Sequence, residues 1–235
     1  FIKGTNVKVG NLDTGTLLTH PDLSARIFKA ATFDLSGNKT SDTCTDTNGH
    51  GTHTTGIIAG GEASGSNIGV APEALLLIGK VFDDTSNASN QSVAGGAEWA
   101  IGEGARIINM SLGGDTGQTD DFWFQQINQW DQLGIFIACS IGNSGPDAST
   151  TSSPGNVPNA MASGAVDGSD QIGSFSSRGP VTVDGSQRMK PDISAPGVDI
   201  RSSIPGGGYQ GGWSGTSMAG PHVAGLVALL ISAQP

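Results

Sequence analysis

Cysteine is almost absent from this chain, which has only Cys44 and Cys139 among its 235 residues. Two cysteines provide neither a disulfide framework nor a metal cluster. Basic residues are also few, since 11 Lys and Arg stand against 21 Asp and Glu and give a formal net charge of −10. The basic residues form no run and a negatively charged surface repels phosphate, so we expect no nucleic-acid partner.

Long apolar runs are missing as well. The longest, residues 219–233, contains Pro221 and His222 and is shorter than the about 20 residues that a membrane helix needs. We therefore expect no membrane partner. The first residues also lack the basic segment and apolar run of a signal peptide, which leaves open a signal that was removed earlier.

Charged residues make up 14% of the chain, well below the roughly 25% of an average globular protein. Glycine is abundant, with 37 residues. This composition does not fit a disordered acidic segment, which needs a high charge density and few apolar residues. The length fits one large domain that can bury a sizeable core.

Short apolar runs alternate with longer segments of helical pattern, which is typical of a parallel sheet with helices on both faces. Trp123, Ile127 and Trp130 recur at helical spacing and predict a helix that ends before Gly134. We expect strands at residues 7–12, 75–82, 106–112, 135–140 and 160–166, helices at 92–103, at 119–133 and after Ser217, and loops at 34–49, 61–69, 143–159 and 203–215.

Three residues in separate segments have the types that nucleophilic catalysis requires. His50 lies among small residues that leave a potential base accessible. Ser217 precedes the apolar run 223–231, where the positive end of a helix would stabilise an oxyanion. Asp13 ends the first predicted strand, where an open α/β sheet places functional groups. Taken singly, each has a structural alternative: a hydrogen-bonded loop histidine, a helix-capping serine and a turn aspartate.

The order of these residues and their flanking motifs resembles the subtilisin-like serine proteases, peptidase family S8. Gly211-Gly212-Trp213 and the Ala-Gly-Pro-His tail at 219–222 most resemble the bacillopeptidase F type within that family. The resemblance implies an α/β subtilisin-like three-layer fold with a central parallel sheet and helices on both faces. The matching motifs are Asp13-Thr14-Gly15, Asp46, His50-Gly51-Thr52-His53, Gly69-Val70-Ala71-Pro72, Lys80-Val81, Asn109-Met110-Ser111-Leu112-Gly113-Gly114, Gly142-Asn143, residues 174–180, residues 190–197 and Gly215-Thr216-Ser217-Met218-Ala219.

The resemblance also implies a role for each matched residue. Ser217 would attack the scissile carbonyl, His50 would take its proton, and Asp13 would orient and stabilise the imidazole. Asn143 occupies the family's position for a side-chain oxyanion donor. The chain is thus expected to be a serine endopeptidase that works through an acyl-enzyme intermediate.

The substrate of such an enzyme would bind as an added β-strand. The matching edges are Ser86-Asn87-Ala88 and Ser111-Leu112-Gly113. No acidic residue demands a basic side chain there, so we expect broad specificity with an apolar preference. The expected partners are protein and peptide substrates and a pro-segment that is cleaved off. The enzyme is expected to be a secreted, extracellular monomer.

Catalysis is expected to need no cofactor and no metal. In the loop at 61–68 only Glu62 and Asn67 offer carboxylate or amide oxygens, fewer than the 6–8 oxygens that calcium takes. The family's high-affinity calcium site is therefore expected to be absent, and structural calcium elsewhere stays open. His50 and His53 lack a third ligand at a motif spacing.

Residues 1–235 are expected to form one subtilisin-like catalytic domain, trimmed at both ends, because family domains have more chain before Asp13 and beyond Pro235. The last helix is apolar all round and should then show an exposed apolar side. Asn11, inside the first strand, would need a hydrogen-bond partner if buried. Cys139 is expected to be a small buried apolar side chain.

The sequence also bears on two other function classes. A lipase or esterase of the α/β-hydrolase class places its acid and histidine after the nucleophile, and no Asp or Glu follows Ser217, so this class is excluded. A non-catalytic binding protein on the subtilisin-like fold stays open. Hydrolysis of a short peptide anilide, blocked by a fluorophosphonate, would distinguish an enzyme from such a binding protein.

Overall fold

The computed structural model describes residues 1–114 and 121–234. The chain divides into two compact units, and each is described by itself. Unit 1 consists of Phe1–Asn109, Arg201–Gly211 and Ala224–Pro235, and unit 2 consists of Met110–Ile200 and Gly212–Val223.

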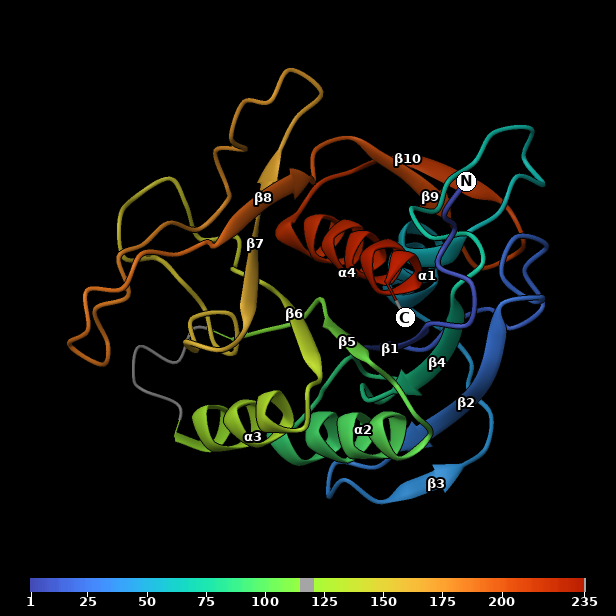
Figure 1. Cartoon of the computed structure of the whole chain (residues 1–235), viewed down its shortest axis with the longest axis horizontal. Coiled ribbons are helices and arrows are strands. Elements are labelled where there is room, and N and C mark those ends of the chain that lie inside the picture. Colours follow the sequence, from blue (N-terminus) through green and yellow to red (C-terminus); the bar gives the residue numbers. More distant parts are fainter. Residues whose placement is uncertain (115–120, 235) are drawn as a thin grey trace. The chain divides into compact units, whose positions relative to one another are not determined.

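The strands of unit 1 are β1 (Lys8–Asp13), β2 (Ile27–Phe33), β3 (Lys39–Ser41), β4 (Leu75–Lys80) and β5 (Ile107–Met110), of which Met110 belongs to unit 2. They follow the order β3-β2-β4-β1-β5 (Figure 1). Both β1 and β2 pair with β4 in parallel, in a register that places Asp13 beside Lys80. Strand β3, at the edge, is antiparallel to its neighbour β2.

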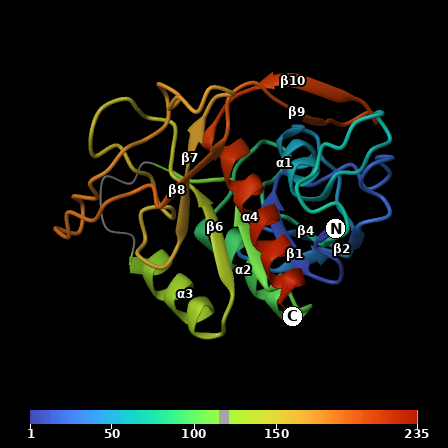
Figure 2. The same cartoon turned by 45° about the horizontal axis from the view of Figure 1, so that its top comes forward.

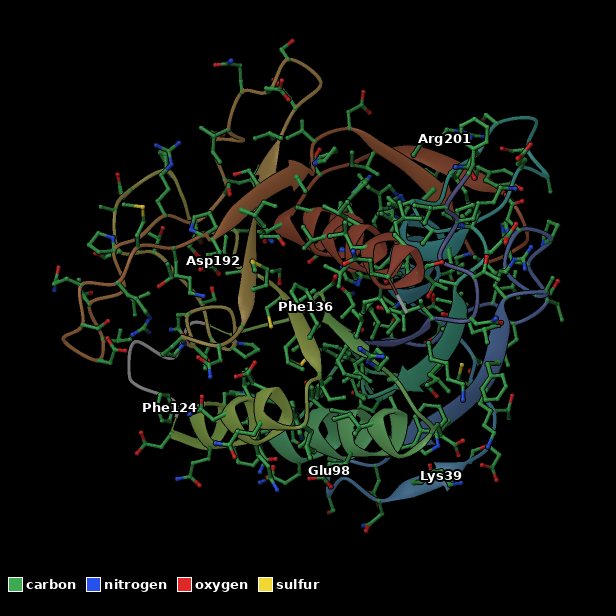
Figure 3. All side chains as sticks on the ribbon, viewed as in Figure 1. Lys39, Glu98, Phe124, Phe136, Asp192 and Arg201 are labelled. Atoms are coloured by element: carbon green, nitrogen blue, oxygen red, sulfur yellow. The ribbon has the colours of Figure 1, made fainter. Side chains whose placement is uncertain are left out.

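Two helices of unit 1, α1 (His50–Ala59) and α2 (Asn90–Gly102), cover opposite faces of this sheet (Figure 1). Successive side chains of a strand point to opposite faces. A methyl group on Gly10 of β1 would contact Ala100 of α2, whereas the next residue, Asn11, donates to Thr54 and Thr55 of α1. Unit 1 therefore has the three layers that the sequence predicts. Glu98, on α2, points away from the sheet (Figure 3).

Asn11 is fully buried, and its amide is hydrogen-bonded on both sides. Its Nδ2 donates to Thr54 Oγ1 over 3.0 Å and to Thr55 Oγ1 over 2.9 Å. Its Oδ1 accepts from Nδ2 of Asn109 on β5 at 2.8 Å. These bonds confirm the expected need for partners, since a buried amide is stable only when it is hydrogen-bonded.

Helix α1 is packed closely by neighbouring backbone. Ser202 and Ser203 of β9 (Ile200–Ser203) donate their hydroxyls to the carbonyl oxygens of His53 and Thr52, each over 2.8 Å. Figure 2 shows β9 and its partner β10 (Tyr209–Trp213) lying beside α1. A methyl group on Gly56 would collide with both serine hydroxyls, and one on Gly51 would collide with the carbonyl oxygen of Gly15. Only glycine permits this close approach.

Helix α1 was not predicted, and it begins at His50, which the structural alternative for this residue placed in a loop. The segment HGTHTTGIIA contains two glycines and three threonines, which are weak helix formers. Nine of its ten residues are buried, so tertiary packing overrides the local preference. Short β3 and β10 likewise lie within the expected loops 34–49 and 203–215, and β2 and β9 were not predicted.

Unit 2 contains β6 (Phe136–Ser140), β7 (Met161–Val166) and β8 (Ile193–Pro196), which pair in parallel in that order. Helix α3 (Asp121–Gln132) packs along β6 (Figure 1). Trp123, Ile127 and Trp130 are buried on one side of this helix, as their spacing predicts, and Phe124 points away (Figure 3). The expected start of this helix, at residues 119–120, lies outside the described residues. Strand β8 was not predicted.

Helix α4 (Thr216–Ala233) begins in unit 2 and ends in unit 1. In unit 2, Ala219 and Val223 pack against Ala165 of β7 and Ala195 of β8. By length and composition α4 could cross a membrane, because its 18 residues have a mean hydropathy of 1.4. The expected lack of a membrane-length apolar segment therefore does not hold, but half of the stretch is buried in the protein, as is usual for a core helix.

Both cysteines are buried and unbridged. Burial raises the pKa of the Cys44 thiol to about 11 and that of Cys139 to about 12. A thiol with so high a pKa forms little reactive thiolate near neutral pH. Cys139 is thus a small buried side chain, as the sequence predicts.

Candidate active site

In unit 1 the carboxylate of Asp13 lies at the end of β1 and is only 2% exposed. It accepts hydrogen bonds from the backbone N–H of Thr14 at 2.7 Å and from the hydroxyl of Thr54 at 3.0 Å. Thr54 lies one turn after His50 on α1. Hydrogen bonds from the strand end and from the helix therefore fix the carboxylate independently of its contact with His50.

The imidazole of His50 lies directly on this carboxylate. Its Nδ1 is 2.7 Å from Oδ1 and 2.9 Å from Oδ2 of Asp13. Because a carboxylate can only accept, Nδ1 carries the proton, and Nε2 of the neutral ring keeps its lone pair. The His50 side chain is 25% exposed, so this lone pair can act as a base.

The pKa of His50 is raised above its ordinary value. Burial is the largest single influence and opposes protonation, but the charge and hydrogen bond of Asp13, together with the charge of Asp46, outweigh it. The two carboxylates thus stabilise an imidazolium, which is the species that a general base becomes when it accepts a proton.

In unit 2, Ser217 is the second residue of α4. Its Oγ donates to the backbone carbonyl of Ser111 over 3.2 Å. The backbone N–H groups in the first turn of a helix have no acceptor within the helix and form its positive end. Ser217 therefore combines a hydroxyl with a backbone donor suited to a developing negative charge.

Asn143 is oriented by the residue before Ser217. Its Oδ1 accepts from the backbone N–H of Thr216 at 2.9 Å and from the Thr216 hydroxyl at 3.0 Å. With Oδ1 engaged in this way, Nδ2 is the donor side of the amide. A methyl group on Gly215 would lie 3.8 Å from this nitrogen, so the donor lies beside the start of α4.

The two expected substrate edges lie in different units. In unit 2, the carbonyl of Leu112 accepts from Ser140 Oγ at 3.2 Å, and Gly113 is exposed. In unit 1 the edge at 86–88 is an exposed loop, held by the Asp83 carboxylate through the backbone N–H groups of Thr85 and Asn87, each at 2.9 Å. The exposed members of the unit 1 edge are Ser86, Asn87 and Ala88.

The structure brings together Asp13 with His50 in unit 1, and Ser217 with Thr216 and Asn143 in unit 2. Sequence analysis missed the anchoring roles of Thr54 and Thr216. Thr216 lies inside a matched motif and Thr54 directly follows one, but a motif alone does not show which atoms they bind.

Two further histidines make structural hydrogen bonds. In His20, Nδ1 accepts from the backbone of Asp22 at 3.1 Å and Nε2 lies 3.0 Å from the Gly208 carbonyl. In His222, Nδ1 lies 2.8 Å from the carbonyl of Met218, one turn back on α4, and burial lowers the pKa of this ring.

The loop at 61–68 uses the carboxylate of Asp22 as an internal support. Asp22 Oδ1 accepts from the backbone N–H of Ala63 at 2.6 Å, and Oδ2 accepts from the Tyr209 hydroxyl at 2.8 Å. Within residues 1–114 and 121–234, no group of three or more His, Cys, Asp or Glu side chains is arranged to hold a metal ion.

Comparison with known proteins gives consistent results. The profile of the subtilase family, peptidase S8, matches residues 4–235. Subtilisin E of Bacillus subtilis (strain 168) is 41% identical over 99% of this chain, which spans 57% of that relative's length. Bacillopeptidase F of Bacillus subtilis (strain 168) is 35% identical over 97% of this chain, which spans 17% of its length. Thus the identity with subtilisin E is higher than with bacillopeptidase F.

The solved structure of sphericase superimposes with a TM-score of 0.88 at 34% identity, over 99% of this chain and 79% of that one. This likeness confirms the expected subtilisin-like α/β fold. Together with the family profile it shows that the chain belongs to the subtilase family.

Proposed function

We propose that residues 1–235 are the catalytic domain of a secreted serine endopeptidase that hydrolyses peptide bonds through Asp13, His50 and Ser217. The observation that carries the proposal is the pair of contacts between His50 Nδ1 and Asp13, at 2.7 and 2.9 Å. They leave the other ring nitrogen unprotonated, as a general base requires.

In the proposed mechanism, Ser217 Oγ attacks the carbonyl carbon of the substrate while its proton passes to His50 Nε2. The Asp13 carboxylate holds the ring and stabilises the imidazolium. The N–H of Asn143 and the backbone N–H of Ser217 bind the negative oxygen of the tetrahedral intermediate. The imidazolium then gives its proton to the leaving amine, and water attacks the acyl-enzyme by the same route.

The proposed substrates are proteins and peptides, bound as an extended strand along Ser86-Asn87-Ala88 and Ser111-Leu112-Gly113. Main-chain hydrogen bonds would supply the affinity, and side-chain pockets would supply a broad, apolar preference. We propose that catalysis needs no cofactor, that the active enzyme is an extracellular monomer, and that a pro-segment is removed from it.

Active-site labelling tests this function. A fluorophosphonate should form one stable adduct, on Ser217, and should stop the hydrolysis of a short peptide anilide; mass spectrometry of the labelled peptide checks the position. The Ser217→Ala variant should not react. As a matched control, Ser169→Ala changes a surface serine in the turn that Asp167 caps, and it should react normally. A native protein that neither reacts nor cleaves would favour the binding-protein alternative.

The pH profile tests the role of His50. Below its pKa the ring is protonated and cannot accept the proton of Ser217, so kcat/KM should fall in acid. Because the pKa of His50 is raised, the midpoint of this fall should lie above the ordinary imidazole value of about 6.5. Anilide hydrolysis measured from pH 5 to pH 9 checks this, and a flat rate between pH 8 and pH 5 would contradict the assignment.

A further inference from the structure

Asp46, in the loop before α1, is surrounded by hydrogen-bond donors. Its Oδ1 accepts from the Thr14 hydroxyl at 2.9 Å and from the backbone N–H groups of Asn48 and Gly49 at 3.1 and 2.8 Å. Its Oδ2 accepts from the backbone N–H and the hydroxyl of Thr52 at 2.8 and 2.6 Å. All these donors are neutral, and in the described part of the chain no ion pair involves Asp46. The negative charge therefore stays uncompensated by a direct cation contact.

The two threonine hydroxyls extend the contacts of this carboxylate. Thr14 Oγ1 donates to Asp46 and accepts from the backbone N–H of Gly51 at 2.9 Å. Thr52 Oγ1 donates to Asp46 and accepts from the backbone N–H of Leu17 at 3.0 Å. Each hydroxyl has one proton, which it donates to Asp46, so its oxygen is left to accept a hydrogen bond from the backbone. Thr14 accepts from the segment 48–52, and Thr52 accepts from the segment 13–17. Asp46 thus clamps residues 13–17 to residues 48–52, the segments that carry Asp13 and His50.

Two carboxylates act on His50, and a lysine lies beside one of them in the sheet. Asp13 lies on β1, Asp46 lies in the loop before α1, and Lys80 ends β4. The Lys80 ammonium is directed elsewhere, to the carbonyl of Thr14 at 3.0 Å and to Asp84 at 3.1 Å. Both carboxylates favour a positively charged imidazole. Asp13 does so by charge and hydrogen bond, and Asp46 does so by its charge.

We propose that Asp46 is a positioning residue of the proposed peptidase: it holds His50 against Asp13, and its charge stabilises the imidazolium that forms when Ser217 attacks. This inference rests on the proposed function. It goes beyond the three proposed catalytic residues, because Asp46 acts through the loop backbone, two threonine hydroxyls and its electric field.

The decisive variant is Asp46→Asn, which keeps the size of the side chain but removes its charge. An amide has one acceptor oxygen, so its NH₂ group must face either the donors of Thr52 or those on the Oδ1 side. We expect kcat to fall about 10- to 100-fold with little change in KM, because misplacement of a catalytic group costs about that much. The acid limb of kcat/KM should move to lower pH by about 0.5–1 unit.

The charge-matched control is Asp34→Asn. Asp34 also caps a loop of unit 1, through the backbone N–H groups of Ser36 and Asn38, each at 2.9 Å, but it makes none of the contacts of Asp46. Kinetics and the acid limb of this variant should match those of the unchanged protein. Equal behaviour of the two variants, or a loss confined to KM, would overturn the inference.

Two further measurements keep the test decisive. The pKa of His50 can be followed by NMR of the ring Cε1–H in a Ser217→Ala background, where no self-digestion occurs and no activity is needed. Asp46→Asn should lower it by about 0.5–1 unit, even if the protein proved not to be a peptidase. If Asp46→Asn fails to fold, Thr52→Val, which keeps the charge, should lower kcat several-fold without moving the acid limb; a wild-type kcat in that variant would contradict the clamp.

Discussion

Replacing Ser217 with Ala should reduce the turnover of a peptide anilide by about 10⁶-fold. The size of this loss is the one known for the nucleophile of subtilisin, a relative. The reason is that the variant has no hydroxyl to form the acyl-enzyme, whereas the donors that bind the oxyanion remain. A residual acceleration of about 10³–10⁴ over water is therefore expected.

The measurement is steady-state hydrolysis with protein prepared free of contaminating peptidases, together with the binding of a peptide inhibitor. Inhibitor affinity should change little, because among the described residues the Ser217 hydroxyl donates to a backbone carbonyl of the protein itself, that of Ser111. Ser169→Ala is the matched control and should keep full turnover. A Ser217→Ala variant with more than about a hundredth of the normal turnover would exclude Ser217 as the nucleophile.

Replacing Asn143 with Leu should lower turnover by about 10²–10³-fold with little change in KM. This magnitude is the one known for the corresponding donor in subtilisin. In the proposed mechanism the side-chain N–H binds the oxygen only once it carries negative charge, so its removal acts on the transition state rather than on substrate binding. Values of kcat and KM for one anilide substrate, measured side by side, check the prediction.

The anchor of Asn143 supplies a graded comparison. Thr216→Val removes the hydroxyl that lies 3.0 Å from Asn143 Oδ1 but keeps the backbone N–H that donates to the same oxygen at 2.9 Å. The amide should keep its orientation for most of the time, and the loss of turnover should be tenfold or less. An Asn143→Leu variant with unchanged kcat would remove Asn143 from the oxyanion role.

Much of the fold could be predicted from the sequence, because the burial of a strand or helix determines which of its positions are apolar. Strands β1, β4 and β6 are covered on both faces, so each is read as an apolar run. Helix α3 has one buried side, so its tryptophans recur at helical spacing. By contrast, β8 is mostly exposed and α1 is buried all round while rich in Gly and Thr. Neither segment therefore shows the regular spacing of apolar residues from which a strand or a helix is predicted.

The candidate site divides in the same way. The identity and order of Asp13, His50 and Ser217 can be read from the motifs, since each type is required by its chemistry. The orientation of the groups cannot. Which side of the Asn143 amide donates depends on Thr216, which is 73 positions further along the chain. The hydrogen bond from Thr14 to Asp46 likewise joins residues that are 32 positions apart in the sequence.

The glycines of α1 have a consequence for how the chain can vary. Added methyl groups at Gly51 or Gly56 would strike the backbone of Gly15 or the hydroxyls of Ser202 and Ser203. A screen of random substitutions around His50 would therefore recover two kinds of inactive clone. Those altered at His50 would still yield soluble, folded protein. Those altered at Gly51 or Gly56 would yield little soluble, folded protein. The glycines near His50 are therefore required for packing, whereas His50 itself is required for proton transfer in the proposed mechanism.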